Sequence, residues 1–434
     1  MTDTELRAAV SGRVILPGDE GFDAAAQPWN RAAVQRVSAV VEPTTPEDAV
    51  ALVHYARKAG RSLFLQPTGH GPSGDVDDAI LVRTTLLGGV AIQGRTARVG
   101  AGVKWGEVQG QAAPLGLSGV CGSSPGVGVT GYTLGGGVGW FSRKYGMAAD
   151  RVTALEVVDA DGDQRRVTAD SDPELFWALR GGSGDFALVT ALEFELVAAP
   201  ALYGGAIIWP AAQGPAVLDA FRTVTADAPD ELTVWVSSVR PPGGAPGMTA
   251  MYATYLGNAE EGRELLRPFE SLGGANADTR RALSPAEIGE VTNDPTDPTP
   301  SAARTELLTD LDVPALPQLF AAPPEPLLVV GVRHLGGALA APVDAACGSL
   351  PEPYLVQLMG LTFTPELAAA VHTAKNKAGD ALAAKATGRR PYTFLSPGDT
   401  AADAFDPDTL ARLRSIKRAR DPHGVFRAAF TVAE

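Results

Sequence analysis

Residues 108–142 read VQGQAAPLGLSGVCGSSPGVGVTGYTLGGGVGWFS, and this stretch decides how the rest of the chain is interpreted. Its 35 residues include no Asp, Glu, Lys or Arg, and eleven of them are glycine. A membrane span would be apolar without being so rich in glycine, serine and proline. Backbone without bulky side chains can approach a ligand closely and offer its N–H groups. The stretch therefore predicts loops packed around something flat or phosphorylated.

Residues 126–131 (GVGVTG) satisfy the dinucleotide fingerprint as a text pattern. That fingerprint must follow a strand and open a helix, with an acidic residue about 20 positions further on. Here the loop-like residues Ser123, Ser124 and Pro125 precede it and more glycines follow, which argues against a nicotinamide site. The sequence has no GxxxxGK[ST] segment, so a P-loop ATPase is excluded.

Composition narrows the class of protein further. A chain of 434 residues is long enough for two or three domains, or for two large ones. The net charge of −14 argues against nucleic acid or an anionic membrane as partner, because both require clustered Lys and Arg. Two cysteines, Cys121 and Cys347, provide neither a disulfide framework nor a Cys-rich zinc pattern. Residues 1–30 show no basic region followed by an apolar run, so a cytoplasmic location is expected.

The N-terminal part is expected to open with a β-α-β unit. Residues 31–41 and 62–66 are strand-like, and the helix between them starts at Pro46 with Thr45 as its cap and stops at Gly60. Further strands are predicted at 80–83, 89–92, 96–99, 152–159, 164–167 and 188–196, with helices at 105–115 and 174–180.

The texture of the sequence changes after Pro200. Strand-like runs at 204–209, 232–239, 248–256, 327–335 and 354–361 are combined with helical runs at 260–269 and 365–378. This alternation predicts a second, α+β domain. Residues 293–300 (NDPTDPTP) predict a polar loop or lid, and residues 406–427 a helix followed by a loop.

His70 is the most distinctive single residue in the sequence. It lies between Gly69 and Gly71 in a tight loop after the expected strand at 62–66. One interpretation is a turn histidine that hydrogen-bonds backbone; the other is a histidine made unusually accessible by neighbours that lack side chains. No second histidine or acid lies at metal-ligand spacing, so we expect no metal site here.

Six segments together carry a family resemblance. They are TGHG (68–71), GSSPGVG (122–128), GYTLGGGVGW (131–140), RKYGMAAD (143–150), RGGSGDF (180–186) and DPHGVFR (421–427). In this order they resemble the FAD-linked oxidases of the vanillyl-alcohol-oxidase/p-cresol-methylhydroxylase superfamily, specifically its berberine-bridge-enzyme-like members. The resemblance covers residues 40–200 and 390–430. Residues 201–385 contain none of these segments and resemble the family only in their general alternation of strand-like and helical runs.

The resemblance implies a two-domain α+β FAD-binding fold whose substrate domain is an antiparallel sheet with covering helices. Residues 1–200 would form the FAD domain, 201–389 the substrate domain, and 390–434 a return to the FAD domain. FAD would be bonded covalently to His70. The remaining implied cofactor contacts are Thr68, Gly69, Gly71, Gly122, Ser123, Ser124, Gly128, Gly131, Tyr132, Gly135, Gly136, Gly139, Trp140, Gly184, Phe186, Val189 and Phe394. The uncharged stretch agrees with this, since a pyrophosphate needs backbone N–H groups and a flat apolar ring disfavours buried charge.

The sequence departs from the family pattern at three places. Doubly linked members have a cysteine directly before the proline, where Ser124 stands here, and Cys121 lies three residues too early. A serine hydroxyl is scarcely ionised at neutral pH, so we expect a single covalent bond, through His70. Asp185 stands where the family usually has Asn, and Phe394 takes the Asn place of a Tyr-x-Asn motif. Tyr392 is the candidate catalytic base, with a packed strand tyrosine as the alternative.

The substrate would meet the sheet of the second domain. Arg333 and His334 lie in the strand-like run at 329–335, and Gln357 and Met359 alternate in the run at 354–360, so these four are the candidate substrate wall. A structural His334 and a core Met359 are the alternatives.

These features together predict an FAD-dependent oxidase that removes hydride from a small-molecule or secondary-metabolite substrate, with dioxygen as acceptor and no metal. We expect a monomer or homodimer. The alternatives are an oxygenating or cyclising flavoenzyme of natural-product biosynthesis, and a flavin-bearing protein that sequesters a drug without turnover.

Overall fold

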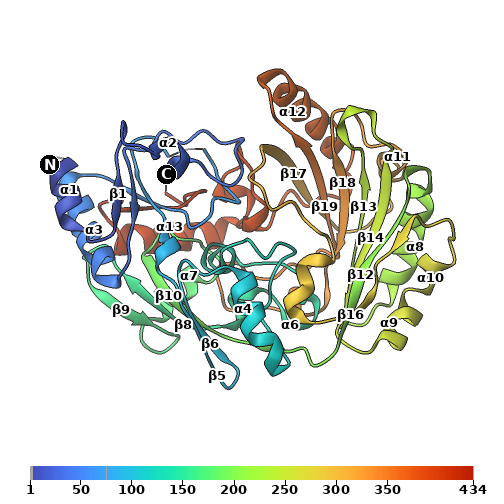
Figure 1. The fold of residues 1–434 in the computed structure, drawn as a ribbon, viewed down its shortest axis with the longest axis horizontal. Helices are drawn as coiled ribbons and strands as arrows, with labels where there is room; N and C mark the ends of the chain where they lie inside the picture. The colour runs from blue at the N-terminus through green and yellow to red at the C-terminus, as the bar shows by residue number, and fades with distance from the viewer. Residues whose placement is uncertain (1–2, 75, 434) are drawn as a thin grey trace.

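The computed structural model describes residues 3–74 and 76–433, and Figure 1 shows two halves side by side. The half on the left of the view holds two five-stranded sheets, and the half on the right is built on one large antiparallel sheet with helices on its outer side. Helices and antiparallel sheets occur together, which confirms the α+β class predicted from the sequence.

The first sheet forms around the predicted β-α-β unit. Its strand order is β1-β2-β4-β3-β20, in which β1 is antiparallel to β2 and the others run parallel. Helix α3 (Pro46–Ala59) starts where the Oγ1 of Thr45 accepts a hydrogen bond from the Asp48 backbone, and it stops at Gly60, whose φ is 62°. The expected strand at 31–41 is wrong in extent, because β2 begins only at Ala39. The strands are β1 (Arg13–Ile15), β2 (Ala39–Glu42), β3 (Leu63–Leu65), β4 (Ile80–Val82) and β20 (Phe426–Arg427), with α1 (Asp3–Ala9) and α2 (Phe22–Ala26) beside them.

Asp48, in the first turn of α3, ties the N-terminal segment to this unit. Its carboxylate accepts hydrogen bonds from the backbone N–H and the hydroxyl of Ser11, both at 2.7 Å, and from those of Thr44 at 2.9 and 2.8 Å. Burial acts to raise the pKa of Asp48, but these four hydrogen bonds lower it to about 2.

The second sheet has the order β5-β6-β10-β8-β9 and confirms the predicted strands to within a residue or two. The expected helix at 105–115 is split into α4 and a 3-10 turn at Ala113–Leu115, where Pro114 lies two residues after the last α-helical residue. The elements here are β5 (Val90–Gln93), β6 (Thr96–Gly100), α4 (Trp105–Ala112), β7 (Leu117–Ser118), α5 (Val129–Leu134), α6 (Ser142–Tyr145), β8 (Val152–Val158), β9 (Gln164–Val167), α7 (Pro173–Leu179), β10 (Leu188–Glu195), β11 (Val197–Ala198) and α13 (Pro407–Arg420).

The large sheet has the order β15-β12-β14-β13-β18-β19-β17, and β16 also pairs with β12. All the strand pairs described in it are antiparallel, as the family resemblance implies for the second domain. Its elements are β12 (Leu202–Pro210), α8 (Gly214–Ala226), β13 (Leu232–Val239), β14 (Met248–Tyr255), α9 (Ala259–Leu265), α10 (Arg267–Glu270), β15 (Ala277–Asp278), β16 (Arg281–Leu283), β17 (Ser301–Leu308), α11 (Ala315–Ala321), β18 (Val329–His334), β19 (Tyr354–Leu361) and α12 (Pro365–Asp380).

The two faces of this sheet differ in character. One face packs under α8, α11 and α12, and its side chains are apolar: Val234, Val236, Val330, Val332, Val356 and Leu358. The opposite face looks toward the first half of the molecule, where Trp235 of β13 stacks on Trp140 with ring centroids 3.6 Å apart. This stacked pair joins the two halves and fixes the position of the sheet relative to the glycine-rich loops.

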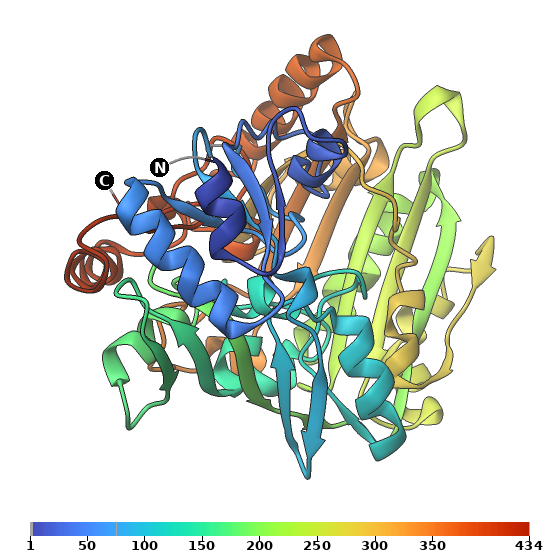
Figure 2. The same cartoon turned by 60° about the vertical axis from the view of Figure 1, so that its left-hand side comes forward.

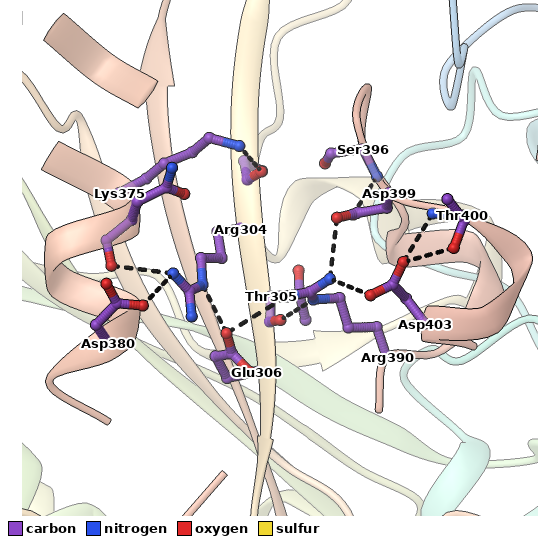
Figure 3. Close-up of polar contacts among 12 residues, drawn as sticks. Arg304, Thr305, Glu306, Lys375, Asp380, Arg390, Ser396, Asp399, Thr400 and Asp403 are labelled. Carbon is purple, nitrogen blue, oxygen red and sulfur yellow. Dashed lines mark hydrogen bonds and ion pairs between the residues drawn. The ribbon is translucent and has the colours of Figure 1, made fainter. Parts of the chain in front are cut away.

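A network of charged side chains attaches the C-terminal segment to β17 (Figure 3). Glu306, which is 2% exposed, lies 2.6 Å from Arg304 Nε and 3.6 Å from Arg390 Nη2. Arg390 also reaches Asp399 at 2.9 Å and Asp403 at 3.2 Å. The network therefore links the edge strand of the large sheet to the segment that returns to the first half of the molecule, which Figure 2 shows beside the N-terminal strands.

Several elements were not expected from the sequence. Strand β17 (sequence SAARTELL) lacks the alternation of apolar and polar residues that predicts a strand. Its charged residues Arg304 and Glu306 are accommodated by the ion-pair network instead. Helices α8 and α11 were missed as well, and the expected helix at 260–269 is interrupted between α9 and α10. Residues 293–300 form an irregular loop, as predicted. Among the residues that the structure describes, no helix is both long enough and apolar enough to cross a membrane.

Candidate functional site

A cavity lies where the glycine-rich loops, the C-terminal segment and the large sheet meet. Its empty space, including the opening to solvent, is about 1470 Å³. Of the residues predicted from the sequence, the following line it: Thr68, Gly69, His70, Gly71, Gly122, Ser123, Ser124, Gly128, Gly131, Tyr132, Gly184, Val189, Arg333, Tyr392 and Phe394. Segments more than 300 residues apart in the sequence are thus brought to one place.

His70 is held in a defined orientation at the cavity wall. Its Nδ1 lies 2.9 Å from Thr68 Oγ1, and its ring stacks on Trp29 with centroids 4.4 Å apart and an interplanar angle of 13°. Burial and then the positive charge of Lys104 lower the pKa of His70 to about 4. The imidazole is therefore neutral at physiological pH and keeps a lone pair, which is the form that can act as a nucleophile.

The glycines around the cavity leave room for a ligand. A β-carbon on Gly131 would have one protein neighbour within 4 Å, the Pro67 Cδ at 4.0 Å, and one on Gly128 would meet Pro67 and Thr68 at 3.5 Å. Space that the protein leaves empty over backbone in a cavity is what a pyrophosphate or a flat ring requires. Position 69 requires glycine for a different reason, because its φ is 78° and a β-carbon there would lie 2.7 Å from Pro28. These residues fit a group such as FAD.

Neither Cys121 nor Ser124, the two residues near the place of the cysteine in doubly linked members, is suited to act as a nucleophile. Cys121 is 1% exposed, and its Sγ accepts a hydrogen bond from Gln109 Nε2 at 3.2 Å. Burial raises the pKa of Cys121 to about 12, so its thiol is protonated at neutral pH. Ser124 does line the cavity, but a hydroxyl is a poor nucleophile without a base.

Several predicted cofactor contacts do not line the cavity. Gly135, Gly136, Gly139, Trp140 and Phe186 are packed against the rest of the protein instead. A β-carbon on Gly139 would lie 1.9 Å from the carbonyl oxygen of Cys121, so glycine is required there by backbone packing. Trp140 stacks on Trp235 and accepts a hydrogen bond on its carbonyl from Thr233.

The strand β18 brings Arg333 to the cavity and turns His334 away from it. Successive side chains of a strand point to opposite faces, so the two neighbours could not both belong to one wall. His334 lies on the apolar face beside Phe221 and Tyr354, with its Nε2 3.0 Å from Arg143 Nη1. Burial, with the charge of Arg143, lowers its pKa to about 3. His334 therefore lies outside the cavity, and this geometry does not support its predicted role as a substrate contact.

Gln357 and Met359 lie outside the cavity, beside the part of its wall that Arg333 forms. In the sheet, Gln357 is paired with Gly331 and Met359 with Val329, which puts them on the same face as Arg333 but further along. Gln357 Oε1 is 3.5 Å from Arg333 Nη2. Neither side chain lines the cavity in this structure.

Tyr392 lines the cavity, but its hydroxyl is already engaged. It donates to the carbonyl of Phe430 at 3.0 Å and accepts from the Phe430 N–H at 3.2 Å. Burial raises the pKa of Tyr392 well above its ordinary value. A phenol in this state is a poor proton acceptor, so the structure does not support Tyr392 as the catalytic base.

Some residues of the site were not found from the sequence. Trp29, which stacks on His70, also donates from Nε1 to the Thr296 carbonyl at 3.3 Å, and this ties the loop at 293–300 to the first half. Residues 428–430 line the cavity because Asp185, fully buried, accepts hydrogen bonds from the Ala428 and Val432 backbone at 2.7 and 2.6 Å. The Asp in the RGGSGDF segment was the signal for this anchor. The described residues include no group of three or more His, Cys, Asp or Glu side chains placed to hold a metal ion.

Comparison with known proteins agrees with this geometry. Residues 37–168 match the family model described as an FAD binding domain. The chain is 37% identical over 206 residues to a (R)-6-hydroxynicotine oxidase of Paenarthrobacter nicotinovorans, an alignment that covers 46% of this chain and 45% of that protein. It is 29% identical over 227 residues to an FAD-dependent monooxygenase of Penicillium roqueforti, covering 51% and 44%. The chain thus spans about half the length of the curated relatives it matches.

Solved structures match over the whole chain. The 6-hydroxy-D-nicotine oxidase from Arthrobacter nicotinovorans has a TM-score of 0.84 at 25% identity, with 98% of both chains covered. The berberine-bridge-enzyme-like protein 1 of Physcomitrella patens has a TM-score of 0.86 at 20% identity, with 100% and 99% covered. The chain therefore carries an FAD-binding domain, and its relatives and structural neighbours lie among the berberine-bridge-enzyme-like oxidases of the vanillyl-alcohol-oxidase/p-cresol-methylhydroxylase superfamily.

Proposed function

We propose that this protein is an FAD-dependent oxidoreductase, with the flavin bound in the cavity described above and joined covalently to His70. The observation that carries the proposal is a neutral, oriented imidazole at the edge of a cavity whose wall is glycine backbone. When bound, FAD would accept hydride from a small-molecule substrate and be reoxidised by dioxygen, which gives hydrogen peroxide. The domain match and the names of the relatives support the cofactor and the class of reaction.

The chain's own residues supply three things in this proposal. The loops at 68–71 and 122–128 and the first turn of α5 would offer backbone N–H groups and space to a pyrophosphate. The ring of Trp29 and the Oγ1 of Thr68 hold His70 in one orientation, so that its lone pair does not have to be positioned at the moment of reaction. The sheet face that carries Trp235 brings Arg333 to the cavity wall, where its guanidinium is held over the Trp235 ring.

The arrangement of the sheets supports the proposed domain boundaries. Residues 1–200 together with 390–434 would bind FAD, because β20 completes the first sheet, and 201–389 would meet the substrate. The two domains are bridged by Asn30, whose side chain exchanges hydrogen bonds with the Ser301 backbone at 3.0 and 3.1 Å.

The test begins with the purified wild-type protein and its absorbance spectrum. After acid precipitation, we expect the flavin in the protein pellet, whereas His70→Ala should release its flavin to the supernatant. Peroxide release on a panel of amines, alcohols and sugars would then establish the acceptor. A protein without flavin would refute the cofactor assignment, and flavin in the wild-type supernatant would refute the covalent bond alone.

A further inference from the structure

Arg333 is a half-buried cation at the cavity wall for which the described residues supply no paired acid. Its guanidinium carbon lies 4.1 Å from the ring centroid of Trp235 and 5.0 Å from that of Phe394, and it lines the cavity. Among the described residues, its one hydrogen bond to a side chain, that to Gln357, is long at 3.5 Å. Burial lowers the pKa of Arg333 to about 10, which still leaves it charged at neutral pH.

Three other arginines of low side-chain exposure, Arg280, Arg390 and Arg83, are each held by acids or by backbone carbonyls. Arg280 pairs with Glu270 and Asp278, both at 2.7 Å, and Arg390 with three acids of the network in Figure 3. Arg83 donates to the carbonyls of Ala25, Gln27 and Gln66. A charge withdrawn from water costs several kcal/mol unless it is paired, so such pairing is the expected state.

Asp294 is the acidic residue whose charge acts on Arg333, but its carboxylate is hydrogen-bonded to another residue. The charge of Asp294 acts to raise the pKa of Arg333, yet the two form no ion pair within 4.0 Å in the part of the chain that the structure describes. The Asp294 carboxylate instead accepts a hydrogen bond from Ser123 Oγ at 2.5 Å. The aromatic rings that contact the guanidinium attract its charge but accept no directed pair of N–H bonds.

We propose that Arg333 binds a carboxylate of the substrate, so that this protein acts on small organic acids. A guanidinium presents paired N–H groups that match the two oxygens of a carboxylate. Trp235 and Phe394 hold the side chain in place, and Gln357 supports it from behind. This inference rests on the proposed function, since it names the substrate class of the same site.

Binding of carboxylates to the flavin-loaded protein tests the inference without turnover. The probes are acetate, benzoate and indole-3-acetate, each compared with its uncharged amide, and the readout is the change in flavin absorbance on titration. We expect each acid to bind roughly tenfold to a hundredfold more tightly than its amide, the range that charge-assisted hydrogen bonds supply. Equal binding of acid and amide in all three pairs, or no binding of any probe, would overturn the inference.

Variants identify the residue responsible. Arg333→Gln should remove the preference for the acid, Arg333→Lys should reduce it several-fold, and Arg240→Gln, at an exposed arginine paired with Glu325, should leave it unchanged. A preference that survives Arg333→Gln, or an unreduced one in Arg333→Lys, contradicts the assignment. If Arg333→Gln does not retain flavin, the wild-type and Arg333→Lys titrations decide.

A second source of negative charge is the reduced flavin itself. Sulfite forms an anionic adduct with oxidised flavin, so its affinity reports how well the site stabilises flavin charge. If Arg333→Gln weakens sulfite binding but keeps the acid preference, Arg333 serves the flavin and the substrate inference is wrong. A purified protein without flavin would instead refute the proposed function, which separates the two failures.

Discussion

The state of His70 predicts how covalent attachment of the flavin depends on pH. Only the neutral imidazole has a lone pair to attack with, so the rate at saturating FAD should follow the neutral fraction. With its pKa lowered to about 4, about 97% of His70 is neutral at pH 5.5. A histidine at the ordinary value of 6.5 would be about 9% neutral at that pH.

The assay starts from flavin-free protein produced under riboflavin starvation. It is mixed with excess FAD in aerated buffer, because joining the imidazole to the flavin methyl group would break a C–H and an N–H bond and release two electrons, which dioxygen would finally accept as hydrogen peroxide. Samples are precipitated with acid at intervals, and flavin fluorescence in the pellet gives the rate. We expect the rate at pH 5.5 to be about the same as at pH 7.5, whereas an ordinary histidine would react about tenfold more slowly at pH 5.5.

Lys104→Gln is the matched variant, since the charge of Lys104 is the second cause of the lowered pKa. Removing that charge should move the fall in rate to higher pH and leave the plateau rate unchanged. A tenfold slower wild-type reaction at pH 5.5, with FAD still saturating, would refute the assignment of a neutral His70 as the attacking group.

Three further predictions concern stability and cofactor retention. Asp48→Asn should lower the free energy of unfolding by about 2.4 kcal/mol at pH 7, because the lowered pKa stabilises the fold above pH 3.8 and this contribution is lost as the pH falls toward 2. Urea unfolding should show about half that difference at pH 3, and a difference independent of pH would contradict the cause. Cys121→Ser should keep its covalent flavin, because the Cys121 thiol is protonated at neutral pH. Flavin found by peptide mapping on a wild-type peptide that contains Cys121 would disprove this. Gly131→Val should lose FAD while Gly88→Val, with no protein atom within 4 Å of its added β-carbon, keeps it; full flavin occupancy in Gly131→Val would show that the loop is misassigned.

Local signals in the sequence predicted the local structure well. Thr45, Pro46 and Gly60 mark the ends of α3 because capping and left-handed backbone depend on the residues themselves. The pairing of β20 with β3 was not predictable in this way, since a strand of two residues has no periodicity and its partner lies some 360 residues earlier. β17 was missed for a similar reason, because its charged residues are compensated by distant segments.

In the candidate site, too, the features set by local sequence could be predicted and those set by distant contacts could not. Its glycine loops and His70 could be predicted because they form continuous motifs, and the structure brings them to one cavity. Whether Tyr392 could act as a catalytic base depends on the hydrogen-bond partner of its hydroxyl, which the sequence does not reveal. In the structure that hydroxyl is hydrogen-bonded to the backbone of Phe430. Trp29 carries no motif at all, and only the folded chain shows that it stacks on His70.

The parallel pairing of β20 with β3 bears on how the protein is made. A ribosome releases residues 426 and 427 only after all the other strands have emerged, so the first sheet stays incomplete through almost the whole of translation. The large sheet draws its strands from residues 202–361 and has no such dependence. Its formation can precede that of the flavin cavity, whose wall at 428–430 arrives last. Loading of the cofactor is then an event that follows synthesis, and a nascent chain stalled before residue 426 should capture no flavin.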